Sequence, residues 1–408
     1  MIVLPDGSLI FPWQLGVWKF AAGQIDHWTS RVWKAGAEQL GRVPFIENSM
    51  VTEWYDLWLS AVLPVRPPPA RERLAGSLIG QCLGDALGFV VEGHSREVCQ
   101  EYVEEVLLTE KAGTIGRSSH KFGQYTDDSQ LARELMESYI ACRGFDPGDY
   151  SRRIAALFSE HRVVGRGRAS TEAAARLARG VHWTRSGVPA PYAGNGAAMR
   201  AAPIGWMFSR SDIDLVRAAR DQARITHTDP RAVAGSVAIA GAVALAVRAV
   251  PGTLKADRFI ERLARWVRPI EPSFAAEIER LDSLRHREPD DAVWSVSRAG
   301  QRPGDAETAG RWPAAEGTIS PFVVSSVLWS LYSFLRSPND YMGAICIAIS
   351  GGGDADTTAA MTGAISGAYL GLSAIPRPLA ERLEDCGTWN YDDLLALADS
   401  FYGVVAST

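Results

Sequence analysis

Glycine recurs at every fourth position in two distant segments, and this spacing constrains the fold more than any other feature of the 408-residue chain. The first set is Gly76, Gly80, Gly84 and Gly88, and the second is Gly363, Gly367 and Gly371. Residues four apart share one face of an α-helix, and each glycine inside a helix costs about 1 kcal/mol relative to alanine. Close approach of another helix or of a ligand must offset that cost. We therefore predict two central helices packed backbone to backbone.

The chain from Leu74 onward shows helical spacing of apolar residues and little period-two alternation, which predicts an all-α domain. Typical segments are "SRRIAALFSEHR", "TEAAARLARG", "DIDLVRAARDQARI", "DRFIERLARWV", "SSVLWSLYSFLRS" and "LEDCGTWNYDDLLALADSFYG". The longest apolar run, "AVAGSVAIAGAVALAV" at 232–247, falls short of the roughly 20 residues that a membrane span needs. It predicts a buried core helix and no membrane association.

The first 70 residues differ in composition and contain six of the thirteen tryptophans. The segment ends in "LPVRPPPARER", where the proline run indicates a boundary near 64–72. Residues 1–66 are therefore interpreted as a small mixed α/β module, with short strands in "SLIFPWQLGVWKF" and a helix in "IDHWTSRVWKAGAEQLGR". This module is either an extension packed on the main domain or a partner-binding arm.

Charge and cysteine content narrow the classes of function. A net charge of −5 provides no overall basic field for nucleic acid, so we do not expect a nucleic-acid partner. The five cysteines are scattered without CxxC spacing, which indicates free thiols in a reducing compartment. The N-terminus lacks a basic region followed by an apolar core, as a signal peptide would have. We predict a cytoplasmic protein.

Two acidic clusters each precede an expected helix. They comprise Thr126, Asp127 and Asp128 in "YTDDS", and Asp354, Asp356 and Thr357 in "GDADTT". Each alone fits a helix N-cap with negative charge at the positive end of the helix dipole. Together they supply the hard oxygen ligands that Mg²⁺, Mn²⁺ or Ca²⁺ prefers. The spacing excludes an EF-hand, and the absence of GK[ST] after the glycines excludes a P-loop.

Two further segments carry glycines suited to binding an anion. They are "VVGRGRAST", with Gly165 and Gly167, and "PYAGNGAAMRAAPIG", with Gly194, Asn195 and Gly196. Backbone N–H groups before a helix can point at a phosphate, although a lone G-x-G is a weak signal. His227 lies on an expected turn in "RITHTDPRAVAG", where a histidine is more often a capping or hydrogen-bonding residue than a catalyst.

This set of motifs resembles the ADP-ribosylglycohydrolase family. The segments "GSLIGQCLGDALGFVVEG", "GQYTDDSQLA", "GNGAAMRAAPIG", "THTDPRAVAG" and "GGDADTTAAMTGAISGAYLG" occur in the family's order within residues 72–403. Residues 1–70 lie outside the resemblance. The resemblance implies an orthogonal multi-helix bundle with a cleft that holds two Mg²⁺ or Mn²⁺ ions.

The resemblance also implies roles for individual residues. The metal ligands would be Thr126, Asp127, Asp128, Asp354, Asp356 and Thr357. The diphosphate of ADP-ribose would be bound by Gly165, Gly167, Gly194, Asn195 and Gly196, with His227 near the ligand. Glu92 matches a mobile glutamate that acts at the reacting carbon in some members, whereas an aspartate of the TDD motif is the proposed base in others. We rank Glu92 first, since metal would occupy Asp127 and Asp128.

The implied reaction is hydrolysis at C1″ of the distal ribose through an oxocarbenium-like transition state. The substrate would be an ADP-ribosylated protein, with arginine the favoured acceptor, or a small ADP-ribosyl compound. No short motif distinguishes arginine from serine, a nucleic-acid base or O-acetyl-ADP-ribose as the acceptor. The alternative is an ADP-ribose-binding or immunity protein whose N-terminal module blocks an ADP-ribosylating toxin.

Overall fold

The computed structural model describes residues 69–117, 120–302 and 317–407, together with the backbones of three short N-terminal strands. The chain divides into two compact units, Met1–Leu63 and Pro64–Thr408. In the first unit, β1 (Ile2–Val3), β2 (Leu9–Trp13) and β3 (Gly16–Phe20) form an antiparallel sheet in the order β1-β2-β3. The segment in which we predict strands contains β2 and β3. The helix predicted at 25–42 lies outside the described residues.

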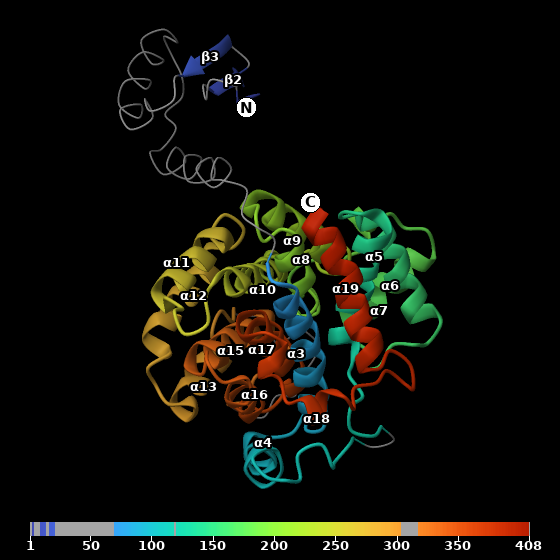
Figure 1. Ribbon diagram of the computed structural model, residues 1–408, viewed down its shortest axis with the longest axis vertical. Helices are drawn as coiled ribbons and strands as arrows, with labels where there is room; N and C mark the ends of the chain where they lie inside the picture. Colours follow the sequence, from blue (N-terminus) through green and yellow to red (C-terminus); the bar gives the residue numbers. More distant parts are fainter. Residues whose placement is uncertain are drawn as a thin grey trace. The chain divides into compact units, whose positions relative to one another are not determined.

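The described part of the second unit contains helices joined by loops and no β-strand, which confirms the all-α prediction (Figure 1). Its longer helices are α3 (Arg71–Phe89), α4 (Arg96–Tyr102), α5 (Asp127–Cys142), α6 (Pro147–Ser159), α7 (Arg168–Ala178), α8 (Ala202–Met207), α9 (Asp212–Arg224), α10 (Pro230–Arg248), α11 (Ala256–Val267), α12 (Pro272–Leu284), α13 (Pro289–Ser297), α15 (Val323–Arg336), α16 (Tyr341–Ser350), α17 (Ala355–Leu370) and α19 (Tyr391–Ser407). The shorter elements are η2 (Val103–Leu107), η3 (Trp183–Arg185), η4 (Leu372–Ala374) and α18 (Arg377–Ala380).

Helices α3 and α17 form the central pair and run antiparallel, in contact through the predicted glycine faces. A Cβ atom on Gly80 would lie 2.5 Å from the carbonyl oxygen of Gly363, and one on Gly367 would lie 2.0 Å from that of Gly76. The backbone-to-backbone prediction is confirmed. Gly371 differs in detail, because it ends α17 with a φ of 90° and so lies just beyond the helical stripe.

Helix α10 contains the longest apolar run. By length and composition this helix could cross a membrane, yet 89% of its 18-residue window is buried inside the bundle. Asp229 caps its first turn by accepting a hydrogen bond from the Arg231 N–H at 2.9 Å. Helix α10 is therefore a core helix, as its alanine-rich sequence predicts.

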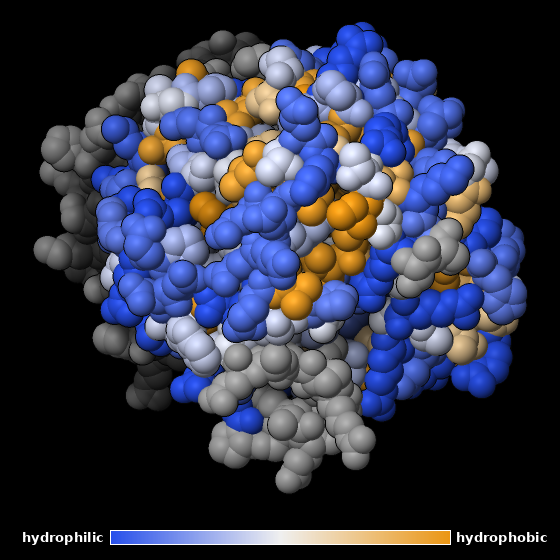
Figure 2. All heavy atoms as spheres, turned by 90° about the horizontal axis from the view of Figure 1, so that it is seen from below, coloured by the Kyte–Doolittle hydropathy of each residue, from blue (hydrophilic) through white to orange (hydrophobic). Residues whose placement is uncertain are grey.

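The face of the bundle that carries α4 and α18 is mostly polar, with apolar atoms gathered near its centre (Figure 2). Val98, Leu108 and Ile115, which lie on α4 and the segment that follows, are 41%, 65% and 43% exposed. Single exposed apolar residues of this kind are ordinary in a globular protein.

Candidate functional site

The two acidic clusters lie at two helix N-termini. Thr126 is the N-cap of α5 and accepts a hydrogen bond from the Asp128 N–H at 3.4 Å, whereas Asp354 is the N-cap of α17 and makes no side-chain cap bond. Capping therefore accounts for Thr126 but does not account for the carboxylates of Asp127, Asp128 and Asp354.

Glu92 lies beside the acidic cluster of α17 because α3 and α17 are antiparallel, so that the end of α3 meets the start of α17. The chain leaves the end of α3, and the Gly93 N–H donates to the Gly353 carbonyl at 2.6 Å while the Gly353 N–H donates to the His94 carbonyl at 2.9 Å. These two bonds hold the turn that carries Glu92 against the glycine loop before α17. Carboxylate oxygens of Glu92, Asp354 and Asp356 lie within 4.8 Å of one another.

The α5 cluster contributes two buried oxygen atoms without a hydrogen-bond partner among the described residues, Asp127 Oδ2 and Asp128 Oδ1. The other carboxylate oxygen of Asp128 accepts a bond from Thr126 Oγ1 at 2.9 Å. Buried carboxylate oxygens are rarely left unpaired, because the loss of hydration is costly. A divalent cation is the kind of group that would satisfy both atoms.

The charges of the two clusters act on each other. Burial, and then Asp85, Asp127 and Asp354, raise the pKa of Asp128 well above its usual range. Burial and the neighbouring Glu92 raise the pKa of Asp354 to about 7. The pKa of Asp356 is raised by burial and by Glu92, with a further contribution from Asp128. The carboxylates therefore repel one another across a shared space, and a bound cation would relieve this repulsion.

Asp85, on α3, holds the start of α5 and is not among the predicted site residues. Its buried carboxylate accepts bonds from the Thr126 N–H (3.0 Å) and from the Ser129 N–H (3.1 Å) and Oγ (2.6 Å), and it shares the single hydroxyl proton of Thr126, whose Oγ1 lies 3.0 Å away, with Asp128. Burial raises the pKa of Asp85 to about 7, although these hydrogen bonds act in the opposite direction. The available signal is a carboxylate one residue after Gly84, on a helix that is buried from Leu74 to Phe89.

The Gly165–Gly167 loop lies against Asp127. The Asp127 N–H donates to the Val164 carbonyl at 2.7 Å, and a Cβ on Gly165 would lie 2.9 Å from Asp127 Oδ1. Gly165 has a φ of 72°, a conformation that favours glycine. The structure therefore places the first predicted phosphate-binding loop directly beside the TDD cluster.

The second glycine loop surrounds His227. A Cβ on Gly196 would lie 3.0 Å from His227 Cε1, and one on Gly194 would lie 3.3 Å from Nε2. Burial, and then the charge of Arg200, lower the pKa of His227 to about 3, so the imidazole is neutral at pH 7. Its Nδ1 lies 2.8 Å from Thr226 Oγ1, which leaves Nε2 toward the glycine loop.

Asn195 connects this loop to the DADTT cluster. Its side-chain Nδ2 donates to Asp354 Oδ2 at 2.5 Å and to Ser326 Oγ at 3.2 Å. The amide therefore orients a candidate metal ligand, a contact that the sequence does not indicate. The structure thus brings both acidic clusters, both glycine loops, His227 and Glu92 into one region of the bundle.

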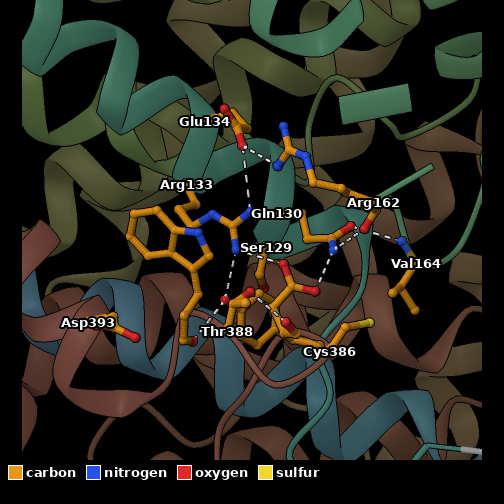
Figure 3. A network of polar contacts seen from close by, with 12 residues as sticks. Ser129, Gln130, Arg133, Glu134, Arg162, Val164, Cys386, Thr388 and Asp393 are labelled. Atoms are coloured by element: carbon orange, nitrogen blue, oxygen red, sulfur yellow. Dashed lines mark hydrogen bonds and ion pairs between the residues drawn. The ribbon is translucent and has the colours of Figure 1, made fainter. Parts of the chain in front are cut away.

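A polar network joins α5 to the turn before α19 and to Val164 (Figure 3). Asp385 accepts bonds from Arg133 Nη1 at 2.7 Å and from Gln130 Nε2 at 2.7 Å. Gln130 in turn accepts the Val164 N–H at 2.9 Å, and Val164 precedes the first glycine loop. A network of this kind couples the turn before α19 to the loop beside Asp127.

That turn corrects one helix prediction. The spacing in "LEDCGTWNYDDLLALADSFYG" predicts helix throughout, but α19 begins only at Tyr391. Cys386, Gly387 and Trp389 have φ values of 50°, 82° and 48°, which a right-handed helix cannot accommodate. The bonds of Asp385 to Gln130 and Arg133, together with Arg133 lying over the Trp389 ring at 4.6 Å, hold this turn in place.

The sequence profile of the ADP-ribosylglycohydrolase family matches residues 66–408. The chain belongs to this family. It is 33% identical over 316 residues to a protein of Archaeoglobus fulgidus, with 77% of this chain and 92% of the relative covered. It is 27% identical over 350 residues to ADP-ribosylhydrolase ARH3 of Homo sapiens, with 81% and 93% covered.

A bacterial relative carries a more specific name. ADP-ribosylarginine hydrolase Tri1 of Pseudomonas putida is 26% identical over 337 residues, with 80% of this chain and 78% of the relative covered. The fold also matches a solved structure, an "ADP-ribosylglycohydrolase-related protein complex", with a TM-score of 0.60 and 26% identity over 82% of this chain and 98% of that one. These similarities confirm the predicted family, the all-α fold and the hydrolase class.

Proposed function

We propose that this hydrolase removes ADP-ribose from an ADP-ribosylated protein side chain by cleaving the bond at C1″ of the distal ribose, with two Mg²⁺ or Mn²⁺ ions. The main support is the pair of facing acidic clusters, in which Asp127 Oδ2 and Asp128 Oδ1 are buried without a partner among the described residues. This arrangement of hard oxygen atoms suits a divalent cation.

The residues that would hold the cations come from both helix N-termini. They are Thr126, Asp127, Asp128, Asp354, Asp356 and Thr357. All six are buried, and the neutral threonine oxygens would limit the accumulated negative charge. When bound, such cations orient and polarise the hydroxyl groups of a ribose.

The glycine loops would bind the ADP-ribose diphosphate. Gly165, Gly167, Gly194 and Gly196 carry no side chain that would block the approach of a phosphate to backbone N–H groups. Asn195 would position this loop, because its backbone N–H donates to the Pro321 carbonyl at 3.1 Å and its side-chain amide is bonded to Asp354 and Ser326. His227 is neutral and would present Nε2 to the ligand without adding charge.

Glu92 is the proposed acid/base group. In hydrolysis the oxygen of water forms a bond to C1″, the bond from C1″ to the acceptor breaks, and a proton passes from the water to the leaving group. Glu92 is suited to carry that proton because its side chain is 38% exposed, whereas Asp127 and Asp128 are buried among the proposed ligands. A carboxylate of the TDD motif is the competing candidate.

Arginine is the proposed acceptor. The support is the similarity to Tri1, whose name specifies ADP-ribosylarginine. A serine-linked substrate is the necessary comparison.

The test is release of ADP-ribose from defined arginine-linked and serine-linked substrates in Mg²⁺, Mn²⁺ or EDTA. We expect cation-dependent release from the arginine-linked substrate, abolished in Asp354→Ala. Glu92→Gln should reduce turnover while retaining cation binding; normal turnover in this variant would assign the base to the TDD motif. No release from either substrate would favour the ADP-ribose-binding or immunity alternative.

The domain boundary is a separate proposal. We place a Trp-rich module at 1–66 and the catalytic domain at 72–403, supported by the division after Leu63 and by a family match that starts at 66. Limited proteolysis of the full chain should first cut within 64–72. Toxin binding by residues 1–66 would be tested by pull-down with the full chain and with a chain lacking them.

A further inference from the structure

We propose that Arg117 is a positioning residue of this site. It holds the Glu92 carboxylate apart from the cations, where the carboxylate can transfer a proton in the reaction at C1″. This inference rests on the proposed function. Arg117 Nη1 lies 2.7 Å from Glu92 Oε2 and also donates to the Phe89 carbonyl at 2.8 Å. Neither the acidic motifs nor the glycine loops include Arg117, which lies on the segment between η2 and α5.

The guanidinium of Arg117 is anchored independently of Glu92. Phe89 is the last residue of α3, and its carbonyl belongs to the helix end where a positive charge is favoured. The Arg117 guanidinium carbon also lies 4.9 Å from the centroid of the Phe89 ring, a cation–π contact. The His120 ring packs edge-on to the same phenyl ring at 5.7 Å. Arg117 would therefore keep its place when the Glu92 side chain moves.

Glu92 lies between this fixed cation and the acidic cluster. Its backbone is fixed by the neighbouring Gly93–Gly353 hydrogen bond, while its side chain is 38% exposed and can rotate. One of its oxygens is within 4.8 Å of oxygens of Asp354 and Asp356, so the carboxylate is close enough to become a cation ligand. The bond to Arg117 opposes that outcome.

The charge balance supports the same role. Two divalent cations would leave one negative charge on Glu92 and the four aspartates of the proposed ligand set, and the buried Asp85 adds a sixth carboxylate behind them. Arg117 supplies the matching positive charge at Glu92, which is outside the proposed ligand set. Without Arg117, Glu92 would be drawn toward the cations and away from the reacting carbon.

Arg117→Ala is expected to raise the affinity for cations and to lower kcat. Cation affinity should rise roughly two- to fivefold, as expected for a partly exposed ion pair, because a repelling charge is lost and Glu92 is released toward the cations. The kcat should fall by about tenfold or more, because the carboxylate is no longer held for C1″. A role in folding alone would lower both quantities together.

The experiment titrates metal-free full-length protein with Mn²⁺ by calorimetry and measures kcat and KM on the arginine-linked substrate. Arg117→Gln is the second variant, because it removes the charge but keeps a donor for the Phe89 carbonyl. Lys121→Ala is the matched control; it removes an exposed cation from the same segment and should change neither quantity. In a Glu92→Gln background, Arg117→Ala should no longer lower kcat.

The inference is overturned if Arg117→Ala and Arg117→Gln bind Mn²⁺ no more tightly than wild type, or if kcat is unchanged. It is also overturned if Arg117→Ala lowers kcat equally in the Glu92→Gln background. An inactive wild type would instead refute the proposed function, so the two failures are distinguishable.

Discussion

The contact between α3 and α17 gives a sharp stability prediction at Gly84. In Gly84→Ala the added methyl carbon would lie 2.2 Å from the Ala359 carbonyl oxygen and 2.7 Å from its carbonyl carbon. Ordinary non-bonded separations are about 3.5 Å or more, so the two helices must move apart by roughly 1 Å. Both contacted atoms are backbone atoms, which cannot yield by a change of rotamer.

The magnitude follows from two opposing terms. Overpacking of a tight core costs about 1–3 kcal/mol, and rigid backbone contacts place this site near the upper end. Replacing glycine by alanine inside a helix raises the free energy of unfolding by about 0.5–1 kcal/mol. We expect Gly84→Ala to lower the free energy of unfolding by about 2 kcal/mol. Because Asp85 adjoins the substitution, cation affinity should fall as well.

The assay is urea unfolding of the metal-free protein, with Gly403→Ala as the matched control. Gly403 lies inside α19, and a Cβ there would meet no atom within 4 Å. The control should gain up to about 1 kcal/mol, since only helix propensity acts. If Gly84→Ala were as stable as Gly403→Ala, close packing of the two central helices would be refuted.

Three further predictions concern buried charges. Asp85→Asn should cost about 3 kcal/mol in urea unfolding, because an amide donor would face the N–H and O–H groups of Thr126 and Ser129. Asp385→Asn should cost about 3 kcal/mol and weaken ADP-ribose binding measured by calorimetry, because Arg133 loses its 2.7 Å ion pair and keeps only the longer one to Glu134. The folded-state pKa of Asp354 is raised to about 7, so the folded protein holds this proton more tightly than the unfolded chain does. The stability that Asp354 contributes to the metal-free protein is therefore full below about pH 4 and is lost as the pH rises through 7. Melting temperatures should therefore fall from pH 5 to pH 8 in EDTA and fall less, or rise, in Mg²⁺; equal slopes would contradict a cation site.

The features that the sequence could predict are those encoded by spacing along the chain. The glycine stripes predict the α3–α17 contact, because a row of glycines on one helix face is stable only where a neighbouring backbone packs closely against it. The TDD and DADTT motifs identify two helix N-termini that the fold then brings together. Short-range sequence patterns are enough to predict these two clusters, since the residues of each cluster lie within one helical turn.

The remaining features depend on contacts between residues distant in sequence. The salt bridge from Arg117 to Glu92 spans 25 residues, and the bonds from Thr126 to Asp85 span 41. No periodic pattern marks either pair. The turn at 385–389 is not predicted because the residues around it fit a helical pattern. Its left-handed residues are held by tertiary contacts: the Cys386 N–H donates to Gln124, and Arg133 of α5 bonds Asp385 and lies over the Trp389 ring.

The most direct test of the proposed metal centre is the number of Mn²⁺ ions bound by EDTA-treated full-length protein, measured together with ADP-ribose release. Two ions per chain are predicted, with turnover restored over the same titration, and Asp128→Asn and Asp356→Asn should lose both effects. Asp392→Asn is the control, because Asp392 and Asp393 form an exposed acidic pair in the first turn of α19 and should leave binding intact. Undiminished turnover in metal-free protein, or no binding at millimolar Mn²⁺, would contradict the proposal.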